Sequence, residues 1–486
     1  MSGAFRKPRR FDANLVVIGA GSAGLVSAYI AAAAKAKVVL VEQHRMGGDC
    51  LNTGCVPSKA LIRSARAANN IRRAAEFGLR AGPVEADLAA VMRRVQDVIA
   101  RIEPHDSIER YTGLGVECVQ GSARLLSPWE VAVGERVITT RAIVIASGGE
   151  PALPALPGID AIETLNSDSL WSLATLPPRL LVLGGGPIGC EMAQAFQRLG
   201  SAVTLVQTRS QLLPREDPEV GALLAARFAA DGIAVLTDSQ PLRFTGTGPA
   251  GALTINRNGA EQTIAFDRVL VATGRRARTT GLGLEVLGIE RNADGTLHTN
   301  RYLQTTQPNV YACGDVTGPY QLTHAAAHQA WYAATNALFG GWRRFAVDYS
   351  VLPWAVYTEP EVARVGLNET EARACSIAVE VTRFDIDDLD RAFTDGAAEG
   401  FVKVLTPPGS DRILGVTTVG PHAGDTQAEL VLAMRHGLGL RKVLGTIHSY
   451  PTLSESNRAV AGAWQRAHLP PWLLQLAERY HGWRRG

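Results

Sequence analysis

The chain has few cysteines and no large excess of charge of either sign. Six cysteines among 486 residues are too few for the disulfide scaffold of a small secreted protein. The 49 basic and 46 acidic residues leave a net charge of only +3, which argues against binding nucleic acid through bulk charge. No apolar segment follows the basic start as in a secretory signal, and no uncharged apolar run is long enough to span a bilayer. We therefore expect a cytoplasmic protein without a nucleic-acid partner.

The length and the glycine content indicate the class of fold. A chain of 486 residues exceeds the size at which one hydrophobic core stops growing, so more than one domain is expected. The shares of apolar residues, 46%, and charged residues, 20%, are ordinary for a globular protein. The 49 glycines exceed the average share of about 7% and stand in an alanine-rich chain. This composition favours an α/β fold with tight turns between strands and helices.

One pattern occurs twice in the chain. Each copy has an apolar strand, three glycines spaced GxGxxG, a helical stretch and a second apolar strand that ends in a polar residue 18 positions after the third glycine. These positions are Gly19, Gly21, Gly24 and Glu42 in the first copy and Gly184, Gly186, Gly189 and Gln207 in the second. The glycines permit a tight turn, a close approach of backbone to a pyrophosphate, and helix-on-strand packing. Two copies at matched spacing therefore predict two dinucleotide sites rather than glycine-rich turns without a ligand.

The remaining segments predict further strands and a separate C-terminal unit. Apolar runs at residues 142–146 and 268–272 also precede glycines and are expected to be buried strands. From about residue 350 the pattern changes to that of an α+β unit. Residues 471–486 are basic and amphipathic, and we expect a terminal helix docked on the protein rather than a helix on a membrane surface.

Two cysteines, Cys50 and Cys55, lie five positions apart directly after the first dinucleotide unit. In a straight helix their Cα atoms would be roughly 8–9 Å apart, whereas a disulfide needs less than about 7 Å. If the two cysteines pair, this segment cannot be a regular helix, and Gly54 and Pro57 suit the required distortion. Two buried cysteines remain an alternative. A metal site is not expected, because CxxxxC is a poor zinc spacing and no second Cys/His pair lies nearby.

These motifs, together with the segment Tyr311–Val316, resemble the flavoprotein disulfide reductases of the pyridine nucleotide-disulfide oxidoreductase family. That family includes dihydrolipoamide dehydrogenase, glutathione reductase and mercuric reductase. The resemblance covers nearly the whole chain, from about Asp12 to about Ala461. It implies two Rossmann-like dinucleotide-binding domains and a C-terminal α+β dimerisation domain. The implied boundaries are 1–156 with 275–349 for the FAD-binding domain, 157–274 for the NAD(P)-binding domain and 350–486 for the dimerisation domain.

The resemblance implies two cofactors, FAD and NADPH or NADH. The implied FAD residues are Gly19, Gly21, Gly24, Glu42, Gly314 and Asp315, and the implied NAD(P)H residues are Gly184, Gly186, Gly189, Gln207 and Arg209. The predicted cofactor-binding set also includes Gly48, Gly148 and Gly274. Gln207 replaces the acid that selects NAD, and Arg209 is a candidate partner for a 2′-phosphate. Gly189 is more usual in NAD-preferring members, but on balance we expect NADPH.

The resemblance also assigns the redox chemistry. Hydride would pass to the flavin and electrons onward to the Cys50–Cys55 disulfide. Cys55 would be the flavin-facing charge-transfer thiol, and Cys50 the thiol that attacks the substrate. Lys59 and Glu191 would form an ion pair near the flavin ring and the nicotinamide.

The C-terminal segment departs from the family pattern. Dihydrolipoamide dehydrogenase and glutathione reductase carry a catalytic His before the proline of this segment, where this chain has Tyr450, whereas the partnering Glu455 is retained. An ordinary Tyr titrates near 10 and a His near 6.5, so Tyr450 is a poor base but a good hydrogen-bond donor. Tyr at this position resembles mercuric reductase, and Tyr111 is a candidate for that enzyme's second tyrosine. From the sequence we expect neither the N-terminal CxxC domain nor the C-terminal cysteine pair of mercuric reductase.

A second departure lies beside the first redox cysteine. Asp49 stands where many family members carry Thr, and its carboxylate is expected to oppose the flavin phosphates and to raise the pKa of Cys50.

The sequence thus predicts an FAD-dependent NAD(P)H:disulfide oxidoreductase. It would act as a homodimer whose active site is shared across the interface, on a small disulfide or a soft metal such as Hg(II). Three alternatives remain open: a dihydrolipoamide dehydrogenase, a flavin-bearing complex subunit with little turnover, and a membrane-surface quinone reductase that uses the basic tail.

Overall fold

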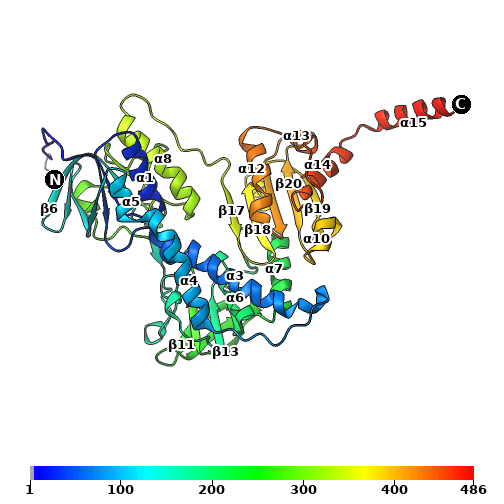
Figure 1. Cartoon of the computed structure of the whole chain (residues 1–486), viewed down its shortest axis with the longest axis horizontal. Helices are drawn as coiled ribbons and strands as arrows, with labels where there is room; N and C mark the ends of the chain where they lie inside the picture. The colour runs from blue at the N-terminus through cyan, green and yellow to red at the C-terminus, as the bar shows by residue number, and fades with distance from the viewer. Residues whose placement is uncertain (1–4) are drawn as a thin grey trace. The chain divides into compact units, whose positions relative to one another are not determined.

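The structure is a computed structural model that describes residues 5–486 (Figure 1). The chain divides into two compact units. The first comprises the residues up to Arg72, Ala81–Thr208 and Ser239–Asp348, and the second comprises Arg73–Arg80, Arg209–Asp238 and Tyr349–Gly486. Residues 1–4 of the predicted FAD-binding domain lie outside the described residues.

The first dinucleotide unit is a parallel sheet with a crossing helix. Strand β1 (Ala13–Ile18) pairs in parallel with β2 (Val38–Glu42) and with β6 (Arg136–Ile145), and α1 (Ser22–Ala33) connects the first two. Strands β3 (Val116–Gln120) and β16 (Val310–Ala312) extend the sheet in parallel beside β2 and β6. Valine, leucine and isoleucine fill β1 and β2, as expected for strands covered on both faces. The first predicted unit is confirmed.

The second dinucleotide unit repeats this arrangement in the first compact unit. Strand β8 (Arg179–Leu183) pairs in parallel with β9 (Ala202–Val206) and β14 (Arg268–Val271), and α6 (Pro187–Leu199) connects β8 to β9. Strand β7 (Gly149–Pro151) pairs antiparallel with β15 (Arg275–Ala277). The predicted duplication is therefore present as two βαβ units.

The other elements of the first unit carry the cysteine segment and the covering helices. They are α2 (Gly48–Asn52), α3 (Cys55–Arg72), α4 (Leu88–Ile102), α5 (Ile108–Gly113), α8 (Thr323–Phe339), β4 (Ala123–Ser127), β5 (Glu130–Val133), β11 (Ser239–Thr245), β12 (Gly251–Arg257) and β13 (Ala260–Phe266). Short 3₁₀ turns include η2 (Glu103–Asp106) and η4 (Leu170–Ser172).

The second unit contains an antiparallel sheet with helices packed on it, which confirms the predicted α+β class. The sheet order is β17 (Pro353–Val356), β18 (Glu361–Gly366), β21 (Gly415–Gly420), β20 (Phe401–Thr406) and β19 (Glu380–Asp385). The helices are α7 (Pro218–Ala230), α9 (Glu369–Ala374), α10 (Asp390–Thr394), α11 (Ala423–Thr426), α12 (Ala428–Arg435), α13 (Leu440–Leu444), α14 (Glu455–Ala467) and α15 (Pro471–Arg485), and strand β10 covers Ala234–Leu236. Trp464 of α14 is fully buried in this core.

The predicted docking of the terminal helix is wrong for the single chain. Helix α15 forms as expected, but none of its residues is buried. Trp472, Leu476 and Trp483 are all exposed, because no part of the described chain covers them. None of the described helices combines the length and the apolar character that a membrane crossing requires.

Candidate active site

The two glycine turns fit the pyrophosphate of a dinucleotide. Gly19 has φ +101°, and a Cβ there would lie 2.4 Å from the carbonyl oxygen of Ala146. Gly184 has φ +113°, and a Cβ there would lie 2.4 Å from the carbonyl oxygen of Ala272. Each turn can therefore be made only by glycine, and each leads into a helix whose N-terminal N–H groups favour an anion.

Glu42 and Gln207, the polar residues predicted to follow the third glycine of each dinucleotide motif by 18 positions, have different contacts. The Glu42 carboxylate accepts hydrogen bonds from the N–H of Ala20 at 2.6 Å and from that of His44 at 2.8 Å, so it lies beside the first turn. Gln207 is buried, and its amide oxygen accepts from the N–H of Thr208 at 2.9 Å. Arg209 is exposed and begins a segment of the second unit. Selection of NADPH over NADH stays a prediction.

The remaining predicted cofactor residues lie in glycine-containing loops of the first unit. Gly148 and Gly274 have positive φ and directly precede β7 and β15. The N–H of Gly314 donates to the side-chain oxygen of Gln329 on α8 at 2.6 Å, and Asp315 follows it. Burial raises the pKa of Asp315, although the nearby Arg275 opposes this shift. The donors and the turns fit FAD, and the individual contacts with FAD stay predictions.

The cysteine segment is not one continuous helix. Helix α2 ends at Asn52, and α3 begins at Cys55, so the helix is interrupted at Thr53 and Gly54. A Cβ at Gly54 would lie 2.9 Å from the carbonyl oxygen of Asp49, which explains why glycine is needed there. The break that a Cys50–Cys55 disulfide requires is therefore present, and both thiols are free and half-buried in this state.

The surroundings of Cys55 favour its thiolate. Its sulfur lies 3.1 Å from the hydroxyl oxygen of Thr323, and the two residues begin helices α3 and α8, whose N-terminal ends favour negative charge. A hydrogen bond with Cys50 lowers the pKa of Cys55 most, and Thr323 and Lys59 lower it further. The same hydrogen bond and burial raise the pKa of Cys50. The pair is therefore polarised, with Cys55 as the anion and Cys50 as the thiol.

The structure brings Lys59 and Glu191 together. The ammonium nitrogen of Lys59 on α3 lies 2.9 Å from a carboxylate oxygen of Glu191 on α6, whose exposed fraction is only 6%. Helices α3 and α6 pack against each other within the first unit. This ion pair therefore joins the helix that carries Cys55 to the helix of the second glycine turn.

A cavity of about 230 Å³ lies beside Cys50. Its lining among the described residues is Ser22, Leu25, Val26, Cys50, Leu51, Val56, Ile102, Asp106 and Tyr111. Burial raises the pKa of Tyr111 to about 12 and also raises the pKa of Asp106, so the phenol is neutral at physiological pH. Cys50 lines this cavity and Cys55 does not, which gives the two sulfurs different access.

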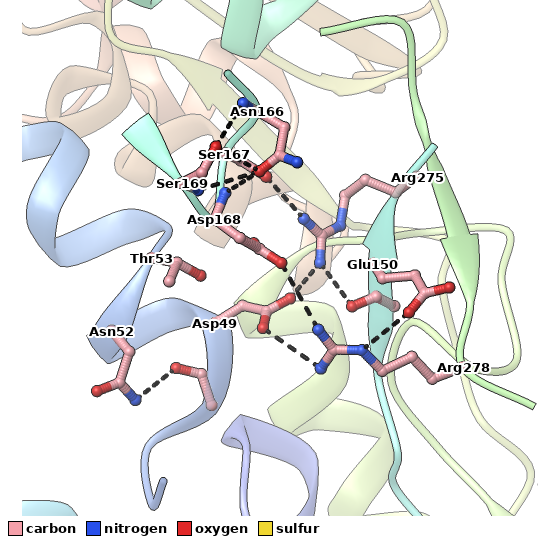
Figure 2. Close-up of polar contacts among 12 residues, drawn as sticks. Asp49, Asn52, Thr53, Glu150, Asn166, Ser167, Asp168, Ser169, Arg275 and Arg278 are labelled. Carbon is pink, nitrogen blue, oxygen red and sulfur yellow. Dashed lines mark hydrogen bonds and ion pairs between the residues drawn. The ribbon is translucent and has the colours of Figure 1, made fainter. Parts of the chain in front are cut away.

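The carboxylate of Asp49 lies beside two arginines. Figure 2 shows the guanidinium groups of Arg275 and Arg278 pointing toward its carboxylate. Arg275 donates to one oxygen of Asp49, and Arg278 lies 3.8 Å from the other. Arg275 also lies 3.7 Å from a carboxylate oxygen of Asp315. The Asp49 carboxylate is therefore balanced by two guanidinium groups, and its expected effect on the flavin phosphates and on Cys50 stays a prediction.

The C-terminal segment does not pair Tyr450 with Glu455 through a hydrogen bond. Tyr450 has an exposed fraction of 70%, and its hydroxyl donates to a carboxylate oxygen of Asp390 at 2.8 Å. This bond raises the pKa of Tyr450, so the phenol is a donor rather than a base. The carboxylate of Glu455 accepts from the N–H of Thr452 at 3.2 Å. His448 is held by Glu429 at 3.0 Å.

Sequence reasoning missed three residues that contact predicted site residues. They are Thr323 beside Cys55, Arg275 beside Asp49, and Asp390 beside Tyr450. The only local signal was for Arg275, which follows the glycine that ends a predicted strand. Thr323 lies 268 positions from Cys55, and Asp390 lies 60 positions from Tyr450, so neither contact has a recognisable spacing in the sequence.

Comparisons with known proteins agree with this geometry. Residues 13–330 match the family model of the pyridine nucleotide-disulphide oxidoreductases, and residues 352–461 match the model of their dimerisation domain. Dihydrolipoyl dehydrogenase of Chlamydia trachomatis is 36% identical over 466 residues, which cover 94% of this chain and 98% of the relative. Mercuric reductase of Streptomyces lividans is 34% identical over 459 residues, which cover 92% of this chain and 95% of the relative.

A solved structure shows the same fold. The HOCl-induced flavoprotein disulfide reductase RclA from Escherichia coli superposes with a TM-score of 0.82 at 26% identity, covering 92% of this chain and 99% of that one. The predicted fold class, two dinucleotide-binding units followed by a dimerisation domain, is confirmed. The chain therefore belongs to the pyridine nucleotide-disulphide oxidoreductases, flavoproteins that use FAD and NAD(P)H.

Proposed function

We propose that this oxidoreductase passes two electrons from NADPH through Cys50 and Cys55 to a small disulfide or a soft-metal acceptor. The observation that carries the proposal is the asymmetry of the two cysteines. Cys50 lines a cavity of about 230 Å³, whereas Cys55 lies among groups that favour its thiolate. An acceptor in the cavity therefore meets Cys50 first.

FAD, when bound, supplies two-electron transfer between the nicotinamide and the cysteine pair. The chain's own residues stabilise the thiolate of Cys55 and keep the proton on Cys50. Thr323 and Lys59 stabilise negative charge on Cys55, and Lys59 is itself fixed by Glu191. The hydrogen bond from Cys50 keeps the proton on the sulfur that faces the cavity.

The acceptor step balances for both classes of substrate. The reduced pair, a thiol on Cys50 and a thiolate on Cys55, releases two electrons and one proton when it closes to a disulfide. A disulfide acceptor takes up the two electrons, that proton and one further proton from solvent, and becomes two thiols. A divalent soft metal takes up the two electrons, and the one proton passes to solvent.

Tyr450 supports reduction of an acceptor rather than oxidation of a dithiol. Oxidising a dithiol substrate needs a base near Cys50 to take its protons, and the hydroxyl of Tyr450 is a donor to Asp390. We also infer a homodimer in which residues 448–455 of one subunit reach the cavity of the other. The match of residues 352–461 to a dimerisation domain supports this inference.

Dihydrolipoyl dehydrogenase is the second candidate, because a relative with that name is 36% identical over nearly the whole chain. Steady-state NADPH oxidation by the purified holoprotein with Hg(II) and with glutathione disulfide should be compared with NADP+ reduction by dihydrolipoamide, and oxidation of dihydrolipoamide is expected to be the slowest. Equal or faster turnover with dihydrolipoamide would favour the second candidate. The Cys50→Ser variant should lose all three activities, and Cys118→Ser, a half-buried cysteine outside the site, is the matched control.

A further inference from the structure

The Cys50 end of the redox segment is held by an ion-pair cluster. The side chain of Arg275 is only 15% exposed and contacts the carboxylates of Asp49 and Asp315. Arg278 lies within 4 Å of Asp49, Glu150 and Asp168, at 3.8, 3.7 and 3.7 Å. The cluster thus joins α2 to β15, to β7 and to the loop that contains Asp168 (Figure 2).

Arg275 is fixed on its other side by the backbone and by a serine. It donates to the carbonyl oxygen of Gly149 at 2.9 Å and to the hydroxyl of Ser167 at 3.3 Å. The loop around Ser167 is itself ordered by Asn166, whose side-chain oxygen accepts from the N–H groups of Asp168 and Ser169. These bonds give the guanidinium one position, in which it faces Asp49.

The other end of α2 is held by the same loop. The indole N–H of Trp171 lies 2.9 Å from the carbonyl oxygen of Thr53, the residue that caps α2, and 2.7 Å from that of Ser167. Both ends of the five-residue helix that carries Cys50 are therefore attached to one loop and one strand. A shift of either attachment would move the Cys50 sulfur relative to Cys55.

We propose that Arg275 is a positioning residue for the redox pair: it holds Asp49, and with it α2, and it neutralises the carboxylate next to Cys50. The inference rests on the redox role of Cys50 and Cys55 proposed above. Without Arg275, the Asp49 carboxylate would be a less compensated negative charge beside a sulfur that must become an anion during turnover. Without Asp49, the positive charge of Arg275 would instead favour that anion.

Other charged groups also face the two sulfurs and must stay unchanged in the test. They are Lys59, Glu191 and Asp315 around Cys55, and Asp106 and the phenol of Tyr111 on the cavity side of Cys50. Substituting Arg275 removes its ion pairs with Asp49 and Asp315, and substituting Asp49 removes its ion pairs with Arg275 and Arg278.

The test is the pH midpoint for alkylation of the Cys50 thiol in the reduced holoprotein, with the long-wavelength absorbance of the Cys55 thiolate recorded alongside. Arg275→Met should raise this midpoint pH by about one, Asp49→Asn should lower it, and the double variant should return toward the wild type. Arg276→Met is the matched control, because Arg276 is the next residue of β15 and is 71% exposed. It should leave the midpoint unchanged.

The outcomes separate this inference from the proposed function. Shifts of the same sign in Arg275→Met and Asp49→Asn, or no shift in either, would overturn the role of Arg275. If Arg275→Met fails to fold, Asp49→Asn alone decides, because only charge neutralisation predicts a lower midpoint. A wild-type protein that gains no thiols on treatment with NADPH contradicts the proposed function, whereas the alkylation profiles still test the ion pair after chemical reduction.

Discussion

Cys50 and Cys55, the proposed redox pair, lie five positions apart but have very different surroundings. Cys55 begins a helix of 18 residues, contacts a hydroxyl at the start of a second helix, and lies near an ion pair. Cys50 lies in a helix of five residues that is held by side-chain attachments at both ends and borders a cavity. The difference teaches that the sulfur with the lowered pKa is stabilised at the start of a long helix, whereas the sulfur beside the cavity is positioned by polar contacts from a loop and a strand.

The largest expected effect comes from removing the acceptor-facing sulfur. Cys50→Ser should lower turnover with every acceptor by roughly 10³-fold or more, because no thiol then attacks the acceptor. The thiolate of Cys55 should remain. Steady-state NADPH oxidation checks the first expectation, and the long-wavelength absorbance checks the second. Retained turnover would show that the acceptor takes electrons by a route that avoids Cys50.

A smaller effect is expected from removing the cation on the Cys55 side. Lys59→Met should slow reduction of the cysteine pair about 10- to 100-fold, since it removes the charge that pairs with Glu191 and favours the Cys55 thiolate. Lys59→Arg keeps the charge and serves as the control. Stopped-flow reduction by NADPH measures the step. Equal rates in the Lys59→Met and Lys59→Arg variants would mean that the positive charge of Lys59 does not accelerate reduction of the cysteine pair.

The acceptor side is tested by restoring the family's histidine. Tyr450→His should raise the rate of dihydrolipoamide oxidation about 10-fold or more, because an imidazole can accept the proton that a phenol bonded to Asp390 cannot. Turnover with Hg(II), which carries no proton to remove, should change less. Asp390→Asn is the matched control, since it weakens the same hydrogen bond without supplying a base. A rate of dihydrolipoamide oxidation that stays low in Tyr450→His would place the limit elsewhere in the site.

The pH dependence follows from the lowered pKa of Cys55. A free thiol titrates near 8.5, and the thiolate of Cys55 should persist as the pH falls through that value and disappear only at the lower folded pKa. The stability that this anion gives the reduced protein is present above about 8.5 and is lost as the pH falls through the folded value. Thermal unfolding of the reduced protein between pH 9 and 5 measures this loss. Unchanged stability across that range would contradict the assignment.

The smallest effect is expected at the C-terminus. Deleting residues 471–486 should change the free energy of unfolding by less than about 1 kcal/mol, because no residue of α15 is buried in the single chain. Denaturant titration measures this difference, and NADPH oxidation should be unaffected. A large loss of stability would show that another surface, such as a second subunit, covers Trp472 and Trp483.

The parts of the molecule that follow from local backbone geometry could be predicted from the sequence. The turns at Gly19 and Gly184 are dictated by positive φ and a close carbonyl, so the two dinucleotide units were predicted with small errors at their ends. The helix break at Gly54 followed from the distance that a disulfide allows.

Contacts between distant residues could not be predicted. Arg275 reaches Asp49 across 226 positions, and this pairing compensates the negative charge of Asp49. The docking of residues 471–486 was predicted wrongly, because an amphipathic pattern shows that a face is apolar but not what covers it.

The central claim is that NADPH reduces a polarised Cys50–Cys55 pair with its thiolate on Cys55. The most direct measurement is anaerobic NADPH titration of the wild type, Cys50→Ser and Cys55→Ser, with thiol counting and absorbance spectra. The account predicts a gain of two thiols and a long-wavelength thiolate band in the wild type, a band in Cys50→Ser, and none in Cys55→Ser. A band in Cys55→Ser, or a wild-type flavin that bleaches without any gain of thiols, would contradict it.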